Sequence, residues 1–193
     1  MIKNQIRPAI VVTLVLMVIT GLAYPAAVTG LAQLLFPRQA NGSLVTVHGE
    51  VVGSALIGQQ FAGAGYFHSR PSGAGNGYDD TVSSGRNLGP TSAKLDTLVM
   101  TALDSERKLD APPSGQVPAD LATASGSGLD PHISPAAAAI QVARVARVRQ
   151  LDSATVAKLV SRFTEGRQLG FLGEPRVNVL LLNLALDSVT NHR

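Results

Sequence analysis

The longest apolar segment of the chain lies near its N-terminus, between Pro8 and Pro37. Residues 9–36 contain no charged side chain, and they outnumber the ~20 apolar residues with which a helix crosses a bilayer. This pattern predicts a single transmembrane helix over 9–36. Pro8 suits the first turn of such a helix, whereas Pro25 removes an interior backbone hydrogen bond and predicts a kink around residues 21–24.

A cleaved secretory signal peptide is the alternative interpretation of this segment. Lys3 and Arg7 form a basic stretch ahead of it, and small residues that a peptidase could recognise follow Pro25. Signal peptides, however, have apolar regions of only about 7 to 15 residues, whereas the apolar character here continues to Phe36. Length therefore favours an uncleaved anchor. Small residues that fit either packing against other membrane helices or ordinary helix composition are Gly21, Ala23, Ala26, Ala27 and Gly30.

Beyond the apolar segment the pattern changes to short elements separated by turns. Residues 44–47 and 51–57 are rich in β-branched side chains and flank 48–50, which predicts a β-hairpin. Residues 178–187 fit either a buried helix or a central strand, and their Leu and Ala content favours a helix. Apolar residues at helical spacing predict three further helices, from Thr91 or Ser92 to Lys108, from Ser134 or Pro135 to Arg149, and from Asp152 or Ser153 to Gly166 or Gly170.

These elements predict the α+β fold class: one transmembrane helix, then a loop-rich domain over 37–193 with a short β-hairpin or sheet and about four helices. The longest loop, 59–90, is dense in Gly, Ser, Pro and Asn but contains Tyr66, Phe67 and Tyr78. Loops of this length are uncommon in compact domains and are usually either functional or disordered. The embedded aromatic residues favour an ordered binding loop over a flexible linker.

The distribution of basic residues predicts the orientation of the chain. Lys3 and Arg7 precede the apolar segment with no acid between them, whereas only Arg38 lies close to its far end. The positive-inside rule therefore predicts a cytoplasmic N-terminus over 1–8 and an exported domain over 37–193 that faces the periplasm or the cell exterior.

Composition excludes several classes of function. The chain has no cysteine, so the exported domain has neither disulfides nor thiolate chemistry and depends on packing alone. Its net charge is +3, its basic residues are dispersed except around Arg144, Arg147 and Arg149, and aromatic residues make up 4% of the chain. A nucleic-acid-binding protein would instead show a concentrated basic stripe and aromatic side chains on which bases stack.

One short loop brings together residue types that act in acyl transfer. Ser125 and Ser127 offer hydroxyls, Asp130 a carboxylate and His132 an imidazole. No Gly-x-Ser-x-Gly sequence accompanies them, and Ser and Asp side chains in loops usually bond to their own backbone. We therefore expect these side chains to organise the loop rather than to form a hydrolytic triad.

Metal and phosphate sites receive little support. Asp79 and Asp80 are adjacent and point apart in an extended chain, and neither they nor Asp130 and His132 show the spacing of a metal site. The glycine-rich residues 73–77 lack the Gly-Lys-Ser/Thr ending of a phosphate loop, so we expect no nucleotide-hydrolysing site on this chain. The remaining histidines, which we expect to face solvent, are His48, His68 and His192.

Five segments carry a resemblance to a known family. They are Gly-Ser-Ala-Leu-Ile-Gly-Gln at 53–59, Tyr-Phe-His-Ser-Arg-Pro-Ser at 66–72, Asn-Leu-Gly-Pro at 87–90, residues 117–135, and Gly-Glu-Pro-Arg-Val-Asn-Val-Leu at 173–180. These blocks resemble the KdpC family, the C subunit of the bacterial Kdp potassium-transporting P-type ATPase, and occur in the family's order. The most specific is Ser-Gly-Ser-Gly-Leu-Asp-Pro-His-Ile-Ser at 125–134.

The resemblance implies a non-catalytic, single-pass subunit of a complex for high-affinity, ATP-driven potassium uptake. Its implied partners are a channel-like potassium-binding subunit, a P-type ATP-hydrolysing subunit and a small membrane peptide. It further implies roles in assembly and as a catalytic chaperone that raises the ATP affinity of the ATP-hydrolysing subunit. This chain would bind no cofactor itself, since ATP, Mg and potassium are used by the complex. An exported domain would affect ATP binding only through coupling across the membrane helices.

No catalytic assignment transfers from the family, because the Asp-Lys-Thr-Gly-Thr motif of P-type pumps is absent. We predict Arg70, Asp130 and His132 as partner-contact or loop-organising residues. The guanidinium group of an arginine can donate two hydrogen bonds to a carboxylate or to backbone carbonyls. An aspartate before a proline, such as Asp130 before Pro131, can fix a turn. The alternatives are a membrane-anchored periplasmic hydrolase, with Ser125 or Ser127 reactive, and a solitary anchored binding module.

Overall fold

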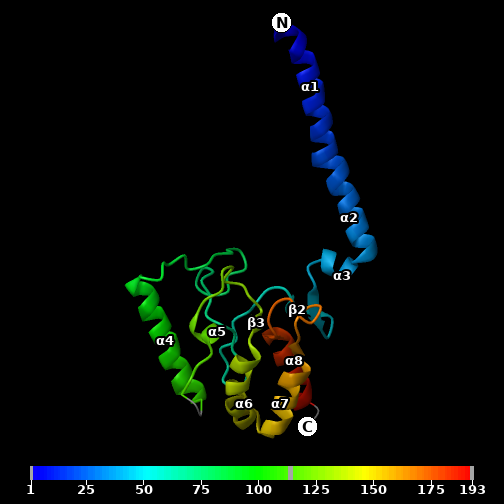
Figure 1. Cartoon of the computed structure of the whole chain (residues 1–193). Coiled ribbons are helices and arrows are strands. Elements are labelled where there is room, and N and C mark those ends of the chain that lie inside the picture. Colours follow the sequence, from blue (N-terminus) through cyan, green and yellow to red (C-terminus); the bar gives the residue numbers. More distant parts are fainter. Residues whose placement is uncertain (1, 113–114, 192–193) are drawn as a thin grey trace. The chain divides into compact units, whose positions relative to one another are not determined.

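The structure is a computed structural model that describes residues 2–112 and 115–191 (Figure 1). It divides into two compact units, Met1–Val51 and Val52–Arg193. An exposed apolar helix dominates the first unit, and a packed core organises the second. The mixture of one apolar helix, small sheets and several helices confirms the predicted α+β class.

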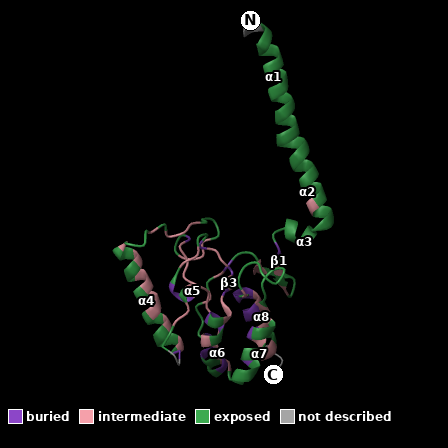
Figure 2. Ribbon diagram, viewed as in Figure 1, coloured by how far each residue is buried: buried purple, intermediate pink, exposed green. Residues whose placement is uncertain are grey.

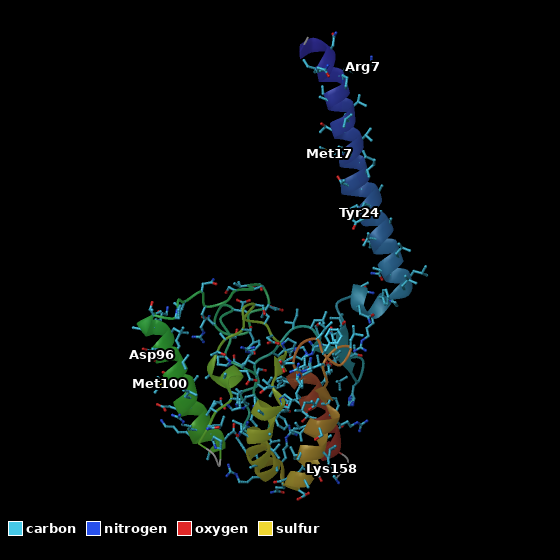
Figure 3. The ribbon with its side chains drawn as sticks, in the orientation of Figure 1. Arg7, Met17, Tyr24, Asp96, Met100 and Lys158 are labelled. Carbon is cyan, nitrogen blue, oxygen red and sulfur yellow. The ribbon has the colours of Figure 1, made fainter. Side chains whose placement is uncertain are left out.

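The first unit is mainly one helix made of α1 (Ile2–Val18), the π-helical turn η1 (Ile19–Ala23) and α2 (Tyr24–Leu35). Over Asn4–Leu35 it is long and apolar enough to cross a membrane. Its side chains project outward (Figure 3), and none of the described ones is buried (Figure 2). A helix this apolar with no protein around it is consistent with a single-pass membrane anchor.

Two prolines mark this helix differently. The π-helical turn ends two residues before Pro25, where the Tyr24 N–H donates to the carbonyl of Ile19, so the helix is irregular where proline predicted a disturbance. The prediction that Pro8 begins the helix is wrong, because α1 begins at Ile2 and contains Pro8. Residues 2–7 include good helix formers and no glycine, so the helix extends back across the single backbone bond that proline removes.

A short helix and a hairpin follow α2, and the second strand of the hairpin runs into the second unit. After α3 (Pro37–Ala40), the strands β1 (Leu44–Val47) and β2 (Glu50–Ser54) form a two-stranded sheet. His48 and Gly49 connect them with φ of 51° and 87°, as a type I′ turn requires. The predicted hairpin is confirmed. Its second strand ends at Ser54 rather than at residue 57, because the Ser54 side chain accepts a hydrogen bond from the Leu56 N–H and the chain turns.

The second unit combines helices with a three-stranded sheet. Strands β3 and β4 both pair antiparallel with the central β5, so that Val177 lies opposite both Ile133 and Thr164. The sequence pattern did not predict this sheet, because its strands are too short to show an alternation. The elements are α4 (Ala93–Asp110), α5 (Ala119–Ala122), β3 (His132–Ile133), α6 (Pro135–Arg149), α7 (Ser153–Arg162), β4 (Thr164–Glu165), β5 (Arg176–Asn178) and α8 (Val179–Asn191).

The predicted helix starts are confirmed by side-chain caps. The Ser92 hydroxyl accepts from the Leu95 N–H, the Ser134 hydroxyl from the Ala137 N–H, and the Asp152 carboxylate from the Thr155 N–H. The predicted helix over 178–187 is also confirmed, as α8. The predicted end of α7 at Gly166 or Gly170 is wrong. It ends at Arg162 because Thr164 and Glu165 leave the helix to pair with β5.

The core of the second unit lies between α6, α7, α8 and the strands β3 and β5 (Figure 2). Each fully buried aliphatic side chain contributes roughly 1.5–3 kcal/mol relative to exposure. Phe67, from the middle of the irregular 59–90 loop, is fully buried in the same cluster. The other members include Val145, Val156, Val160, Val177, Leu182 and Leu186.

The 59–90 loop is ordered by side chains rather than by strands. The Asn183 side chain accepts from the Phe67 N–H and donates to the Phe67 carbonyl, both at 2.9 Å. Gln141 bonds in the same way to both backbone groups of His68. Each helix side chain thus replaces a neighbouring strand, satisfying backbone groups that would otherwise be buried without partners.

The three remaining histidines do not share one environment. His48 is exposed, as predicted. The prediction that His68 faces solvent is wrong. Its ring lies 3.1 Å from the Gly63 carbonyl, and its partial burial lowers its pKa below the ordinary value. His192 lies outside the described residues.

Candidate functional site

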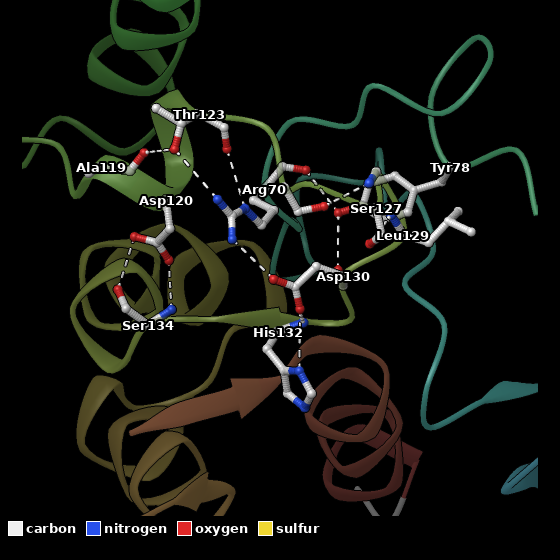
Figure 4. Close-up of polar contacts among 12 residues, drawn as sticks. Arg70, Tyr78, Ala119, Asp120, Thr123, Ser127, Leu129, Asp130, His132 and Ser134 are labelled. Atoms are coloured by element: carbon white, nitrogen blue, oxygen red, sulfur yellow. Dashed lines mark hydrogen bonds and ion pairs between the residues drawn. The ribbon is translucent and has the colours of Figure 1, made fainter. Parts of the chain in front are cut away.

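The structure brings Arg70, Asp130 and His132 together, although they come from different segments. Arg70 lies in the 59–90 loop, Asp130 in the loop before β3, and His132 begins β3. One carboxylate oxygen of Asp130 lies 3.0 Å from Arg70 Nη1. The other oxygen accepts from the His132 N–H at 3.0 Å and lies 3.3 Å from His132 Nδ1 (Figure 4). One carboxylate therefore joins two loops and a strand.

The Arg70 guanidinium also reaches the end of α5. Its Nε donates to the Thr123 carbonyl at 3.3 Å, and Nη2 lies 3.5 Å from the Thr123 hydroxyl. The Tyr78 hydroxyl donates to the Arg70 carbonyl at 2.9 Å. Arg70 thus holds α5, the 59–90 loop and Asp130 in one arrangement (Figure 4). A planar arginine can hold several acceptors at once, which a lysine could not do with the same geometry.

Electrostatics favour the ionised form of Asp130. Partial burial by itself would raise the pKa of this carboxyl group, but hydrogen bonds from His132, together with the hydrogen bond and charge of Arg70, outweigh it. The pKa of Asp130 therefore lies below its ordinary value. Burial raises the pKa of Tyr78 to about 12, so its hydroxyl stays a hydrogen-bond donor at physiological pH.

A shallow groove of about 340 Å³ opens beside these three residues. Asp120 forms one wall, where it accepts from both the N–H and the hydroxyl of Ser134. Glu174 and Arg176 contribute further charged groups. The groove therefore offers fixed charges of both signs rather than an enclosed apolar cavity, and this arrangement suits polar contacts with another protein surface more than retention of a small apolar molecule.

The loop serines bond to their own backbone. The Ser125 hydroxyl accepts from the Gly128 N–H at 2.9 Å. The Ser127 hydroxyl accepts from the Leu129 N–H at 3.1 Å (Figure 4). The His132 ring contacts Asp130 through Nδ1, as a triad histidine would, but the hydrogen bonds of both serine hydroxyls go to loop N–H groups rather than to this ring. The two serine hydroxyls and one Asp130 oxygen thus accept hydrogen bonds from backbone N–H groups of their own loop and of His132.

The acidic residues considered for metal binding do not gather. Asp79 accepts two hydrogen bonds from Thr81, one from its backbone and one from its hydroxyl, within a local turn. Asp130 is engaged by Arg70 and His132. Within residues 2–112 and 115–191, no three His, Asp or Glu side chains are placed to hold a metal ion.

Sequence reasoning missed a buried polar network centred on Arg144 of α6. Its Nε lies 2.7 Å from Asp110, at the end of α4, and both side chains are almost fully buried, with exposures of 2% and 0%. Its Nη1 donates to the carbonyls of Ala64 and Tyr66, and its Nη2 to Gln141. The only sequence signal was an arginine among the alanines and valines of a core-facing helix.

Arg149 also holds the 59–90 loop. It lies further along α6 than Arg144. Its guanidinium donates to the Gly65 carbonyl, pairs with Asp187 at 2.7 Å, and lies 4.4 Å from the centre of the Tyr66 ring. The Tyr66 hydroxyl completes the arrangement by donating to Asp187. Helices α6 and α8 therefore fix the backbone on which Arg70 is carried.

The α4 end of the network carries an excess of negative groups. Among the described residues, Glu106 Oε2 and Asp110 Oδ2 are buried without a hydrogen-bond partner. Burial, and then the neighbouring charge of Asp110, raise the pKa of Glu106 to about 7 despite the opposing charge of Arg144. Glu106 therefore holds its proton far above the pH at which an exposed glutamate loses it.

Comparison with known proteins decides the family. The family described as "K+-transporting ATPase, c chain" matches residues 6–188. The chain belongs to the KdpC family. Among proteins named potassium-transporting ATPase KdpC subunit, that of Gemmatimonas aurantiaca is 60% identical over 188 residues, covering 97% of this chain and 94% of the relative. That of Methylococcus capsulatus is 57% identical over 187 residues (96% and 98%), and that of Rhodospirillum rubrum is 58% identical over 184 residues (95% and 95%).

The resemblance predicted from the five sequence blocks is thereby confirmed, and four of the KdpC blocks meet in the fold. The Gly58 N–H donates to the Leu129 carbonyl, joining 53–59 to 117–135. The Asn178 side chain donates to the Ala55 carbonyl, joining 173–180 to 53–59. The Arg70–Asp130 pair joins 66–72 to 117–135. Segments far apart in the sequence therefore converge on one site beside the groove.

Proposed function

We propose that this chain is a non-catalytic accessory subunit of a high-affinity, ATP-driven potassium uptake complex of the Kdp type. The observation that carries the proposal is the convergence of four KdpC blocks on one hydrogen-bonded site. The polar side chains of that site hold loops: Asp130 bonds to Arg70 and His132, and the serines bond to backbone N–H groups. Groups committed in this way support a fixed surface rather than a reacting centre.

The proposed partners are a channel-like potassium-binding subunit, a P-type ATP-hydrolysing subunit and a small membrane peptide. The apolar helix would join them in the bacterial inner membrane, with residues 1–8 cytoplasmic and the domain over 37–193 periplasmic. Lys3 and Arg7, against Arg38 alone at the far end, support this orientation. ATP, Mg and potassium would be bound by the partner subunits, and this chain would bind none of them.

We also propose that the subunit acts as a catalytic chaperone that raises the ATP affinity of the ATP-hydrolysing subunit. A periplasmic domain cannot touch a cytoplasmic nucleotide, so the effect would pass through the membrane helices as a coupling free energy. A tenfold change in ATP affinity corresponds to about 1.4 kcal/mol, which is within the usual range for such coupling.

The Arg70–Asp130–His132 groove is the proposed partner-contact surface of the exported domain. Its charged groups are partly exposed and are held in place by α5, β3 and the 59–90 loop. Fixed charges at a rim confer specificity and orientation on a protein interface. Because these side chains are already held in place, little conformational entropy is lost when they bind.

Purification of the assembled complex tests this function. With the full chain carrying Arg70→Met and Asp130→Asn together, we expect the recovery of partner subunits with the tagged chain to fall at least tenfold. The matched control is Arg107→Met, which removes an exposed pair with Asp104 on α4 and should leave recovery unchanged. Full recovery with the double variant, or labelling of Ser125 or Ser127 by an active-site reagent, would contradict the proposal.

A further inference from the structure

A small hairpin between β4 and β5 presents apolar side chains to solvent. Among the described large apolar residues of Val52–Arg193, Leu169 and Phe171 are the most exposed, at 84% and 68%. Leu172 beside them is also exposed. We call these three residues the apolar tip. Contiguous exposed apolar side chains surrounded by polar ones are characteristic of a contact site, whereas single exposed ones are ordinary.

Backbone hydrogen bonds close the hairpin that carries the apolar tip. Gln168 and Leu172 exchange two backbone hydrogen bonds of 2.9 Å, and the Gly170 N–H donates to the Arg167 carbonyl. Leu169 has φ of +53°, a left-handed conformation that asparagine or glycine adopts more easily. A leucine in this conformation carries a local backbone cost, and such costs are often found at contact sites. A hairpin tip whose backbone is already ordered loses little conformational entropy when it enters a pocket.

The stem of the hairpin is charged but neutral as a whole. Arg167 pairs with Glu174 at 2.7 Å, and Arg176 pairs with Glu165 at 2.9 Å. The stem therefore has no surplus of basic groups, and surplus basic groups are what would attract the tip to anionic lipid headgroups. An apolar centre with a rim of charged pairs is instead the anatomy of a protein–protein interface. These observations favour a protein over a bilayer as the occupant.

We propose that the apolar tip inserts into an apolar pocket on the exported surface of a partner subunit of the same complex. This inference rests on the function proposed above. Three side chains bury far less than the ~1,200–2,000 Å² of a free-standing interface, so the tip needs a partner already held nearby. The apolar helix of the same chain supplies this condition for any subunit that shares its membrane, because tethering raises the effective concentration.

Photocrosslinking in the assembled complex tests the occupant. Phe171→benzoylphenylalanine keeps an aromatic side chain at the tip, and Met100→benzoylphenylalanine on α4 (Figure 3) is the control, because Met100 is 49% exposed and away from the hairpin. We expect Phe171→benzoylphenylalanine to form an adduct with one partner subunit, at least tenfold above the Met100 control. An adduct with lipid, an adduct with a second copy of this chain, or no adduct above the control would overturn the proposal.

A second measurement separates this inference from the proposed function. The double variant Leu169→Asn and Phe171→Ser should dissociate from the detergent-solubilised complex at least tenfold faster than the unaltered chain, whereas Met100→Gln should not. Both tip positions are exposed, so the domain should fold in either case. If the unaltered chain recovers no partner subunits, the proposed function fails. If it recovers them and the tip variant dissociates at the same rate, only the inference about the tip fails.

Discussion

Replacing Arg144 by methionine removes the centre of the buried network between α4, α6 and the 59–90 loop. The substitution keeps much of the side-chain volume but leaves the Asp110 carboxylate, which has no exposed surface, without its cation. Breaking a buried ion pair from one side costs about 3–5 kcal/mol. The Ala64 and Tyr66 carbonyls also lose their donor, at about 1 kcal/mol each, although such terms do not add fully.

We therefore expect Arg144→Met to lower the free energy of unfolding by about 4 kcal/mol, a large part of the ~5–15 kcal/mol of an ordinary domain. The assay is urea unfolding of the full chain in detergent micelles, followed by far-ultraviolet circular dichroism. Arg107→Met is the matched control, because Arg107 pairs with Asp104 in solvent, and its loss should cost less than about 0.5 kcal/mol.

A double variant tests the physical reason. If the cost arises from an unpaired buried charge, Arg144→Met combined with Asp110→Leu should recover at least half of the stability lost by Arg144→Met alone. A cost below about 1 kcal/mol for Arg144→Met would refute the argument that the network holds the loop in place. Equally, a double variant less stable than either single one would show that the charge pair is not the cause.

Three further predictions concern the groups around this network and the site. Glu106 has a folded-state pKa of about 7 against an ordinary 4.5, so its contribution to stability is full below pH 4.5 and is lost as the pH rises through 7. Above pH 7 the Glu106→Gln variant should therefore have a free energy of unfolding about 1–2 kcal/mol higher than the unaltered chain, a value reduced because Glu106 is partly exposed. Below pH 4.5 the two proteins should be equally stable, and urea unfolding at a series of pH values measures both differences. Gly128→Ala should lower stability by about 2–4 kcal/mol, because its φ is +72° and the new Cβ would lie 2.6 Å from Ser84 O, whereas Gly126→Ala meets nothing within 4 Å and should be neutral. Tyr78→Phe should cost about 1 kcal/mol in the same assay by leaving the Arg70 carbonyl without its donor.

Each of these predictions has a contradicting result. A pH-independent difference between Glu106→Gln and the unaltered chain would show that Glu106 does not titrate in the folded state near neutrality. Equal stability of Gly128→Ala and Gly126→Ala would show that the 125–134 loop is not tightly packed at Gly128. A Tyr78→Phe variant with unchanged stability would show that water replaces the hydroxyl at the Arg70 carbonyl.

Local pattern was sufficient for the elements whose signal repeats along the chain. The apolar helix, the hairpin around His48 and Gly49, and the long helices all follow from periodicity, caps and turn residues. The three-stranded sheet could not be predicted in this way, because its strands have two or three residues and their pairing is long-range. The same pairing ended α7 before the glycines that local reasoning took as its stop.

The candidate site was predictable in its residues but not in its geometry. Motif identity pointed to Arg70, Asp130 and His132, yet the Arg70–Asp130 contact joins positions 60 residues apart, which no spacing rule connects. The Arg144 network was missed altogether. A buried arginine is stable only where the fold supplies a carboxylate and carbonyls, and only the folded chain shows that Asp110 and the 59–90 loop supply them.

The central claim is that this chain is an accessory subunit on which the complex depends, without a catalytic site of its own. Potassium-stimulated ATP hydrolysis, titrated with ATP in preparations made with and without the chain, tests this claim most directly. We predict that the chain alone hydrolyses no ATP, and that its omission either prevents recovery of the complex or raises the ATP concentration needed for half-maximal activity at least tenfold. An intact complex with unchanged ATP dependence in its absence would contradict the account.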